Sequence, residues 1–235
     1  MRALIIDNDA EVAEAVGLTF GITWPDSETI TASSGDSGIY LAGSEWPSLV
    51  ILEIDLPDMD GFTICKEIRR FSDVPIIMLT ERSKEGDVVR GLQVGADDYI
   101  IKPLRGLVFM AKVKAVMRRA EPTPTVVGGQ VVEFGDLKVD FAAAAVFVGE
   151  HRISLTPTEY RLLCQLLKSA GKVVPSRTLL GQVWGRDYLD ETRYLKVHIK
   201  HLRNKLGDDP AAPKYIFTER NVGYGFVNST TKPNG

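Results

Sequence analysis

Residues 49–61 read Leu-Val-Ile-Leu-Glu-Ile-Asp-Leu-Pro-Asp-Met-Asp-Gly, and this stretch decides the fold of the first half of the chain. Its run Val50-Ile51-Leu52 is continuously apolar, which is typical of a strand buried on both faces of a parallel sheet. We predict that the strand spans Leu49–Ile54, so that Glu53 lies near its carboxyl end. A helical pattern follows at Phe62–Phe71. The stretch therefore predicts a βα unit with an acid at the end of its strand.

The same alternation of short apolar runs and helical patterns extends through residue 120. The other expected strands are Ala3–Asp7, Thr29–Ala32, Pro75–Thr80 and Asp98–Lys102. The other expected helices are Glu11–Phe20, Asp36–Gly43, Gly86–Gly95 and Leu107–Arg119. Five βα units predict an α/β domain over residues 1–120, with a doubly wound five-stranded parallel sheet covered on both faces.

The pattern then changes, which indicates a second domain. Residues 121–130 contain two prolines and two glycines without helical periodicity, and we predict that they form a linker. Residues 131–228 are predicted to form an α+β domain, and residues 229–235 a disordered tail. The connections between the expected strands of this second domain are short, which favours antiparallel pairing. These strands are Val131–Phe134, Leu137–Asp140, Ala145–Val148, His151–Ser154, Tyr215–Thr218 and Tyr224–Val227. Its expected helices are Thr158–Ser169, Ser176–Trp184 and Glu191–Leu206.

Charge is distributed unevenly between the two halves of the 235 residues. Residues 1–121 hold 13 basic and 20 acidic side chains, a net charge of −7, whereas residues 122–235 hold 15 and 11, a net charge of +4. The basic second half favours nucleic acid as a partner. Because no run of 18 apolar residues occurs, we expect no membrane span. Cys65 and Cys164 fall in separate predicted helices, which argues against a disulfide framework and fits a reducing cytoplasm. We predict that Cys65 and Cys164 lie in separate helices as buried thiols and form neither a disulfide nor a metal site.

Polar side chains gather where the predicted strands of the first domain end. Chemistry in open α/β sheets is found at the carboxyl ends of strands, so we expect these side chains to share one edge of the sheet. They are Asp7, Asn8 and Asp9 after the first strand, Glu53 on the third, Thr80 on the fourth and Lys102 on the fifth.

At this point residues 1–120 closely resemble the receiver domains of response regulators, which have a flavodoxin-like fold. The resemblance is carried by Leu4–Asp9, Leu49–Gly61, Pro75–Thr80 and Gly95–Pro103. It implies that an Asp at the end of the third strand accepts a phosphoryl group from a histidine kinase, while acids after the first strand bind Mg²⁺. It also implies that Thr80 and Lys102 contact the phosphoryl oxygens, that Thr80 and Tyr99 form the switch, and that a cis peptide precedes Pro103.

Two positions depart from the family pattern. Glu53 stands at the phosphoacceptor position, four residues before Pro57, and Asn8 stands where the second metal-binding acid belongs. Loss of a carboxylate weakens a site for a hard cation, so we expect Mg²⁺ binding by Asp7, Asp9 and Glu53 to be weak or absent and no cofactor to be required. The extra methylene of Glu53 moves its carboxylate by roughly 1.5 Å, toward a position that Lys102 and Thr80 can bind.

These departures predict a receiver that is active without a kinase, because Glu53 partly mimics a phosphorylated Asp. One alternative is an inert receiver that serves only for dimerisation, and another is residual kinase-dependent phosphorylation, for example on Asp55. A metal-assisted phosphatase is disfavoured because Asn8 weakens the metal site, so we expect no enzymatic activity.

A homodimer is also implied by the resemblance. Related receivers dimerise through charged pairs on the fourth helix, fifth strand and fifth helix, and Val108 stands where the family usually has Glu. Exposed pairs contribute only ~0–1 kcal/mol each, so one such loss is compatible with association. The expected interface residues are Arg90, Asp97, Asp98, Lys112, Arg118 and Arg119.

The helix expected over Thr192–Leu206 indicates DNA binding. Its apolar residues, Leu195, Ile199, Leu202 and Leu206, form one narrow stripe, and basic residues cover most of the remaining surface. The preceding helix and the loop Gly185–Asp190 complete a helix-turn-helix with a long turn. The expected DNA-binding residues are Arg193, Tyr194, Lys196, Val197, His198, Lys200, His201, Arg203, Lys205 and, at the tip of the hairpin, Arg220.

Residues 131–228 resemble the winged-helix DNA-binding domain of the OmpR/PhoB family of response regulators. The matching segments are Leu155–Leu163, Ser176–Trp184, Val197–Leu206 and Arg220–Tyr224. We expect Lys200, Arg203 and Lys205 to contact phosphates of promoter DNA, and Arg193, Val197 and His201 to contact bases. The resemblance implies that the loop 185–190 can contact RNA polymerase. It leaves open inverted or tandem half-sites and, as an alternative, an interaction protein whose DNA-binding half is vestigial.

Overall fold

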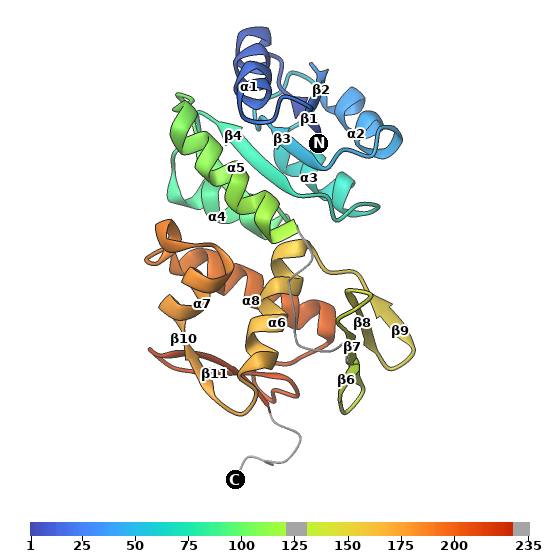
Figure 1. Ribbon diagram of the computed structural model, residues 1–235, viewed down its shortest axis with the longest axis vertical. Coiled ribbons are helices and arrows are strands. Elements are labelled where there is room, and N and C mark those ends of the chain that lie inside the picture. The colour runs from blue at the N-terminus through green and yellow to red at the C-terminus, as the bar shows by residue number, and fades with distance from the viewer. Residues whose placement is uncertain (121–130, 228–235) are drawn as a thin grey trace. The chain divides into compact units, whose positions relative to one another are not determined.

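The computed structural model describes residues 1–120 and 131–227 (Figure 1). The predicted linker 121–130 and the predicted tail 229–235 lie outside these residues. The chain forms two compact units, Met1–Arg118 and Arg119–Gly235. Among the described residues, no helix is both long and apolar enough to cross a membrane.

The first unit is the predicted α/β domain. Its parallel sheet has the strand order β2-β1-β3-β4-β5. β2 therefore lies on one side of β1, and β3, β4 and β5 follow on the other side. The strands are β1 (Arg2–Ile6), β2 (Glu28–Ala32), β3 (Leu49–Leu52), β4 (Ile76–Thr80) and β5 (Asp98–Ile101). The helices are α1 (Ala10–Thr23), α2 (Gly35–Ser44), α3 (Gly61–Arg69), α4 (Glu85–Gln93) and α5 (Gly106–Ala120). The prediction of a doubly wound, flavodoxin-like sheet is confirmed.

Helices pack on both faces of this sheet (Figure 1). On one face, Val16 and Phe20 of α1 and Phe109 and Val113 of α5 form a core with alternate residues of the strands, such as Ile51. On the other face α2 contacts β1 and α3, and α4 contacts β5. Coverage of both faces explains why the residues of β3 and β4 are all buried and read as continuous apolar runs.

The second unit begins with the predicted antiparallel sheet, in the order β6-β7-β8-β9. Its strands are β6 (Val131–Phe134), β7 (Leu137–Asp140), β8 (Ala145–Val148) and β9 (His151–Ile153). The helices that follow are α6 (Pro157–Lys168), α7 (Ser176–Val183) and α8 (Thr192–Leu206). Each of these helices contacts the other two, which fixes α8 against α6 and α7. The predicted helix-turn-helix is thereby present as a packed unit.

A second small sheet closes this unit, in the order β10-β12-β11. The predicted hairpin is β11 (Ile216–Glu219) and β12 (Gly223–Phe226), and β10 (Val173–Pro175) pairs antiparallel with β12. The sequence analysis missed β10, because three residues ending in proline carry no alternation. It also treated Gly185–Asp190 as a plain loop, whereas Arg186–Tyr188 forms the short 3-10 helix η1. The architecture is a winged helix-turn-helix.

Candidate functional site

The loop after β3 is built to hold Glu53 at the end of the sheet. Gly61 donates its backbone N–H to the carbonyl of Ile54 at 2.8 Å, and a Cβ at Gly61 would stand 2.4 Å from the carbonyl oxygen of Glu53. Only glycine permits this approach. Asp58 accepts hydrogen bonds from the first amides of α2, and Asp60 is the N-cap of α3. The acids of the Leu-Pro-Asp-Met-Asp-Gly segment are therefore structural.

Glu53 lies in a buried ionic cluster with Lys102 and Asp7. The Lys102 Nζ lies 2.6 Å from Glu53 Oε2 and 2.9 Å from Asp7 Oδ2. The other oxygen of Glu53 accepts hydrogen bonds from the backbone N–H groups of Ile54 (2.6 Å) and Asp55 (3.1 Å). Only 6% of the surface of each of the residues Glu53 and Asp7 is exposed to solvent. The predicted contact between Glu53 and Lys102 is present in the structure.

The cluster favours the charged form of Lys102. Burial alone would lower the pKa of Lys102, but hydrogen bonds and charge interactions with Glu53 and Asp7 outweigh burial and raise that pKa. Two carboxylates with one ammonium leave a net negative charge at the edge of the sheet. A fixed negative group therefore stands where the family pattern places a transient phosphoryl group.

The carboxylates of Asp7 and Asp9 at this edge bind other groups of the chain. Asp9 was expected to help Asp7 and Glu53 bind the ion, but its side chain is the N-cap of α1 and accepts from the amides of Glu11 and Val12. Asp7 Oδ1 accepts from the Asp9 amide, and its Oδ2 binds Lys102. Among the described residues, no three His, Cys, Asp or Glu side chains form a metal-binding group.

The remaining pocket residues lie around this cluster. Asn8 is exposed and lines a groove between α1 and β2 with residues such as Gly17 and Thr29. Thr80 was expected to bind the Glu53 carboxylate; its hydroxyl oxygen instead accepts a long hydrogen bond of 3.4 Å from the amide of Arg82. The peptide before Pro103 is cis, as the resemblance implied.

Tyr99 of β5 points inward. It is 4% exposed, and its hydroxyl donates a 2.8 Å hydrogen bond to the backbone carbonyl of Arg82. Burial, followed in size by the nearby charge of Asp87, raises the pKa of the Tyr99 phenol, so the group remains a donor at neutral pH. The predicted switch residue is thus bonded to the loop between β4 and α4.

Arg82 joins this loop to the loop that carries Glu53, and the sequence analysis missed it. Its guanidinium Nε lies 3.1 and 3.0 Å from the two carboxylate oxygens of Asp55, and its Nη2 also contacts Asp55. The hydrogen bonds from Arg82 lower the pKa of Asp55. A signal was available, because Asp55 and Arg82 follow the ends of the neighbouring strands β3 and β4 and carry opposite charges.

Two acids of the predicted dimer face are engaged within their own domain. Asp97 binds Arg69 Nη2 at 2.9 Å and the amide of Ile76 at 3.1 Å, so it fixes α3 and β4 to the start of β5. Asp98 accepts from Lys112 Nζ at 2.9 Å. Both acids therefore have a partner within their own domain, and their part in a dimer interface stays a prediction.

The other residues of that face lie on the two helices, as expected. Arg90 is exposed on α4, and its guanidinium carbon lies 4.1 Å from the centre of the Phe62 ring. Arg118 and Arg119 lie in the last turn of α5.

The exposed positions of α8 include Lys196, Lys200 and Asn204, which recur every four residues along one face. Arg193, one turn before Lys196 and Val197, forms a 2.6 Å ion pair with Glu191. Lys196 also lines a groove between α7, α8 and the hairpin, together with residues such as Ser176 and Tyr224. Lys196 thus lies beside the hairpin of β11 and β12, which is the wing of the domain.

Four residues expected on the exposed basic surface of α8 are buried, namely Tyr194, Val197, His198 and Arg203. The Tyr194 ring packs edge-on against Tyr188, and the His198 ring packs edge-on against Trp184, with centroids 5.5 and 5.0 Å apart. The packed face of the helix is therefore wider than the predicted stripe of four aliphatic residues.

Arg203 and Lys205 bind other parts of their own domain rather than extending into solvent. Arg203 Nη2 donates to the carbonyl of Ile216 at 2.7 Å and to the hydroxyl of Thr218 at 2.9 Å, which ties α8 to β11. Lys205 Nζ lies 2.7 Å from Glu159 Oε2, and His201 Nδ1 lies 3.7 Å from Glu159 Oε1. Glu159 also completes the capping box of α6.

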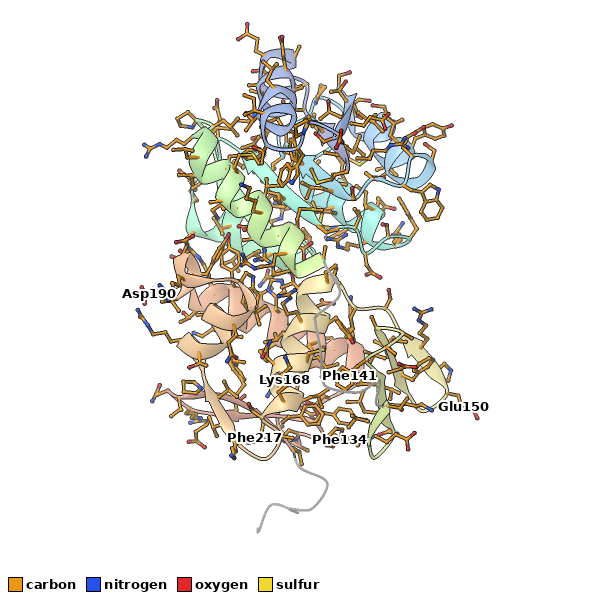
Figure 2. All side chains as sticks on the ribbon, in the orientation of Figure 1. Phe134, Phe141, Glu150, Lys168, Asp190 and Phe217 are labelled. Carbon is orange, nitrogen blue, oxygen red and sulfur yellow. The ribbon has the colours of Figure 1, made fainter. Side chains whose placement is uncertain are left out.

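The hairpin presents Arg220 at its exposed tip, beside Asn221 in a left-handed conformation. Gly225 lies opposite Phe217, labelled in Figure 2, in the register of the hairpin. A Cβ at Gly225 would stand 2.2 Å from the Phe217 ring. Asp190, also labelled in Figure 2, forms an ion pair with Arg177 and lines the same groove as the hairpin residue Asn221.

Comparison with known families assigns both halves of the chain. Residues 3–114 match the response regulator receiver domain, and residues 149–226 match the family described as transcriptional regulatory protein, C terminal. The transcriptional regulatory protein AfsQ1 of Streptomyces coelicolor is 39% identical over 94% of this chain and 96% of its own. The KDP operon transcriptional regulatory protein KdpE of Escherichia coli is 41% identical over 81% of this chain and 84% of its own.

Solved structures agree with this assignment. A RitR mutant matches with a TM-score of 0.76 and 26% identity over 96% of this chain and 98% of that chain. DrrB of Thermotoga maritima, described as an OmpR/PhoB homolog, matches with a TM-score of 0.50 and 31% identity over 97% of this chain and 99% of that chain. The chain therefore belongs to the OmpR/PhoB family of response regulators, in which a receiver domain precedes a DNA-binding transcriptional regulatory domain.

Proposed function

We propose that this transcriptional regulator acts without phosphorylation of its receiver, because Glu53 supplies a permanent negative group. The observation that carries the proposal is the 2.6 Å ion pair between Lys102 Nζ and Glu53 Oε2. In relatives a phosphoryl group on Asp brings negative charge to this lysine. Here the carboxylate of Glu53 already binds it, and Asp7 binds the same ammonium at 2.9 Å.

The position of Tyr99 supports an active-like receiver. The resemblance to receivers associates activation with an inward aromatic residue on the fifth strand, and Tyr99 is buried and bonded to the Arg82 carbonyl. A carboxylate at the strand end and an inward tyrosine are therefore present together in the chain. A ligand that binds one of two states shifts the equilibrium only by its differential affinity, and a built-in carboxylate acts in the same way.

The output of this state is binding to promoter DNA by a homodimer. We propose that α8 enters the major groove, that Lys196, Lys200 and the wing residue Arg220 contact phosphates, and that Arg193 contacts a base. Val197 and His201 reach bases only if their surroundings rearrange on binding. The receiver face that carries Arg90 and Lys112 is the proposed dimer interface, and the segment 185–190 a contact for RNA polymerase.

Incubation of the full chain with acetyl phosphate and Mg²⁺, followed by intact mass spectrometry, tests this function. We expect no phosphoryl adduct, because the Glu53 carboxylate is buried against Lys102 and the carboxylates of Asp7 and Asp9 bind other groups of the chain. A stoichiometric adduct that also increases DNA affinity would overturn kinase-independent action, while the assignment to DNA-binding regulators would stand.

A further inference from the structure

Arg82 makes contacts in four directions, which no other residue of its loop does in the part of the chain that the structure describes. Its guanidinium binds both carboxylate oxygens of Asp55, and its Nη1 lies 3.9 Å from Asp87 Oδ1 in the first turn of α4. Its amide donates to the hydroxyl oxygen of Thr80 at 3.4 Å. Its carbonyl accepts from the Tyr99 hydroxyl at 2.8 Å. One residue thus touches the Glu53 loop, the start of α4, and both switch residues.

The bidentate geometry makes this pair more than an ordinary surface ion pair. Two parallel hydrogen bonds from one guanidinium to one carboxylate restrict the relative orientation of both groups. The backbone of Asp55 is also fixed, because its amide donates a 3.1 Å hydrogen bond to Glu53 Oε1. A continuous path of hydrogen bonds therefore runs from Lys102 through Glu53 and Asp55 to Arg82, and from the Arg82 carbonyl to Tyr99.

We infer that Arg82 is a positioning residue that couples the Glu53–Lys102 pair to Tyr99, by holding the β4–α4 loop against Asp55 so that its carbonyl meets the Tyr99 hydroxyl. In this chain the loop is held by an ion pair between two fixed side chains. The inference deepens the proposed function and rests on it only for the consequence for DNA binding.

The test follows Tyr99 directly. The full chain is labelled with 3-fluorotyrosine, which gives seven ¹⁹F sites, and the Tyr99 resonance is identified with Tyr99→Phe. The variants are Arg82→Gln, Arg82→Lys, Asp55→Asn and the double variant Arg82→Gln/Asp55→Asn. The matched control is Arg70→Gln, which removes another exposed arginine that pairs with an acid, Glu67, on α3.

We expect Arg82→Gln and Asp55→Asn to move the Tyr99 resonance in the same direction, toward the position of a solvent-exposed fluorotyrosine. The double variant should move it no further than either single variant, because both changes break the same pair. Arg82→Lys should retain part of the native shift, and Arg70→Gln should retain all of it. The Arg82 carbonyl survives in each variant, so a change at Tyr99 reports movement of the loop.

A native Tyr99 resonance in both Arg82→Gln and Asp55→Asn, with thermal unfolding curves that show folded protein, would overturn the inference. Parallel DNA-binding titrations separate this outcome from failure of the proposed function. If the two variants move Tyr99 while neither they nor Glu53→Gln alter DNA affinity, the coupling stands and kinase-independent activation fails. If all three weaken DNA binding severalfold and Tyr99 moves, both stand.

Discussion

The Lys102 Nζ and the Glu53 Oε2 lie 2.6 Å apart at the carboxyl edge of the parallel sheet. The lysine side chain is 13% exposed and the glutamate side chain 7%, so the pair is largely shielded from solvent. Shielded charges interact more strongly than exposed ones but lose more hydration, so their value lies in fixing one arrangement rather than in net stability. The pair is well suited to hold one state of the receiver.

Removal of the lysine should destabilise the chain strongly. Lys102→Met leaves the carboxylates of Glu53 and Asp7 buried without a cation, and loss of one partner of a buried pair costs about 3–5 kcal/mol. Urea unfolding measures this loss. Lys114→Met, at an exposed site on α5, is the control and should change the free energy of unfolding by no more than about 0.5 kcal/mol. Equal stability of the two variants would contradict the buried cluster.

Restoration of the two missing family acids should create a phosphorylation site. Glu53→Asp shortens the side chain by one methylene, which withdraws the carboxylate by roughly 1.5 Å, and Asn8→Asp returns a carboxylate ligand for Mg²⁺. With acetyl phosphate and Mg²⁺, we expect the double variant to gain a phosphoryl adduct in intact mass spectra. The wild-type chain is the matched control. A double variant that remains unmodified would show that these two positions alone do not disable the pocket.

The two exposed lysines of α8 should set the salt dependence of DNA binding. Each cation that contacts a phosphate releases counterions, so Lys196→Ala and Lys200→Ala should each reduce the slope of log affinity against log salt by about 1. Fluorescence anisotropy titrations over a range of salt concentrations give the slope. The control Lys138→Ala removes an exposed cation from β7, in the β6–β9 sheet rather than on α8, and should leave the slope unchanged. If both α8 variants keep the wild-type slope, Lys196 and Lys200 do not contact phosphates and DNA binds another surface of the chain.

Both cysteines should be inert in the folded chain. They are free and buried, and burial raises the pKa of Cys65 to about 12 and that of Cys164 to about 11. The thiolate is the reactive form, so the folded protein should hold almost none of it at pH 8. We expect no labelling by iodoacetamide at pH 8 and labelling of both thiols in urea. Rapid labelling of either thiol in the native protein would contradict its burial.

The doubly wound parallel sheet and the cluster of polar side chains at its edge could be predicted from the sequence. The carboxyl ends of parallel strands lie at one edge of the sheet. Asp7, Glu53 and Lys102 could therefore be placed close together once their strands had been recognised. The sequence was not sufficient for Asp9, which follows Asp7 and Asn8 but serves as the N-cap of α1. Asp is a preferred capping residue, and this competing use of the side chain was overlooked.

The surface of α8 shows a second limit. A helical wheel gives the direction of each side chain from the axis, but not what stands beside the helix. The aromatic neighbours Tyr188 and Trp184 cover Tyr194 and His198, and β11 captures the guanidinium of Arg203. Such contacts depend on how neighbouring elements pack against the helix, and the link between Arg82 and Asp55 joins two separate loops, so spacing alone did not predict them.

The most direct test of the account compares the unphosphorylated wild-type chain with Glu53→Gln on a DNA duplex that the full chain has selected from a random pool. The amide keeps the size of the side chain and removes its charge, so Lys102 loses one of its two carboxylate partners. Coupling between sites is typically worth 1–3 kcal/mol, and we therefore expect the dissociation constant to rise by roughly 5- to 150-fold. An unchanged dissociation constant in a folded Glu53→Gln chain would contradict the claim that this carboxylate activates the receiver.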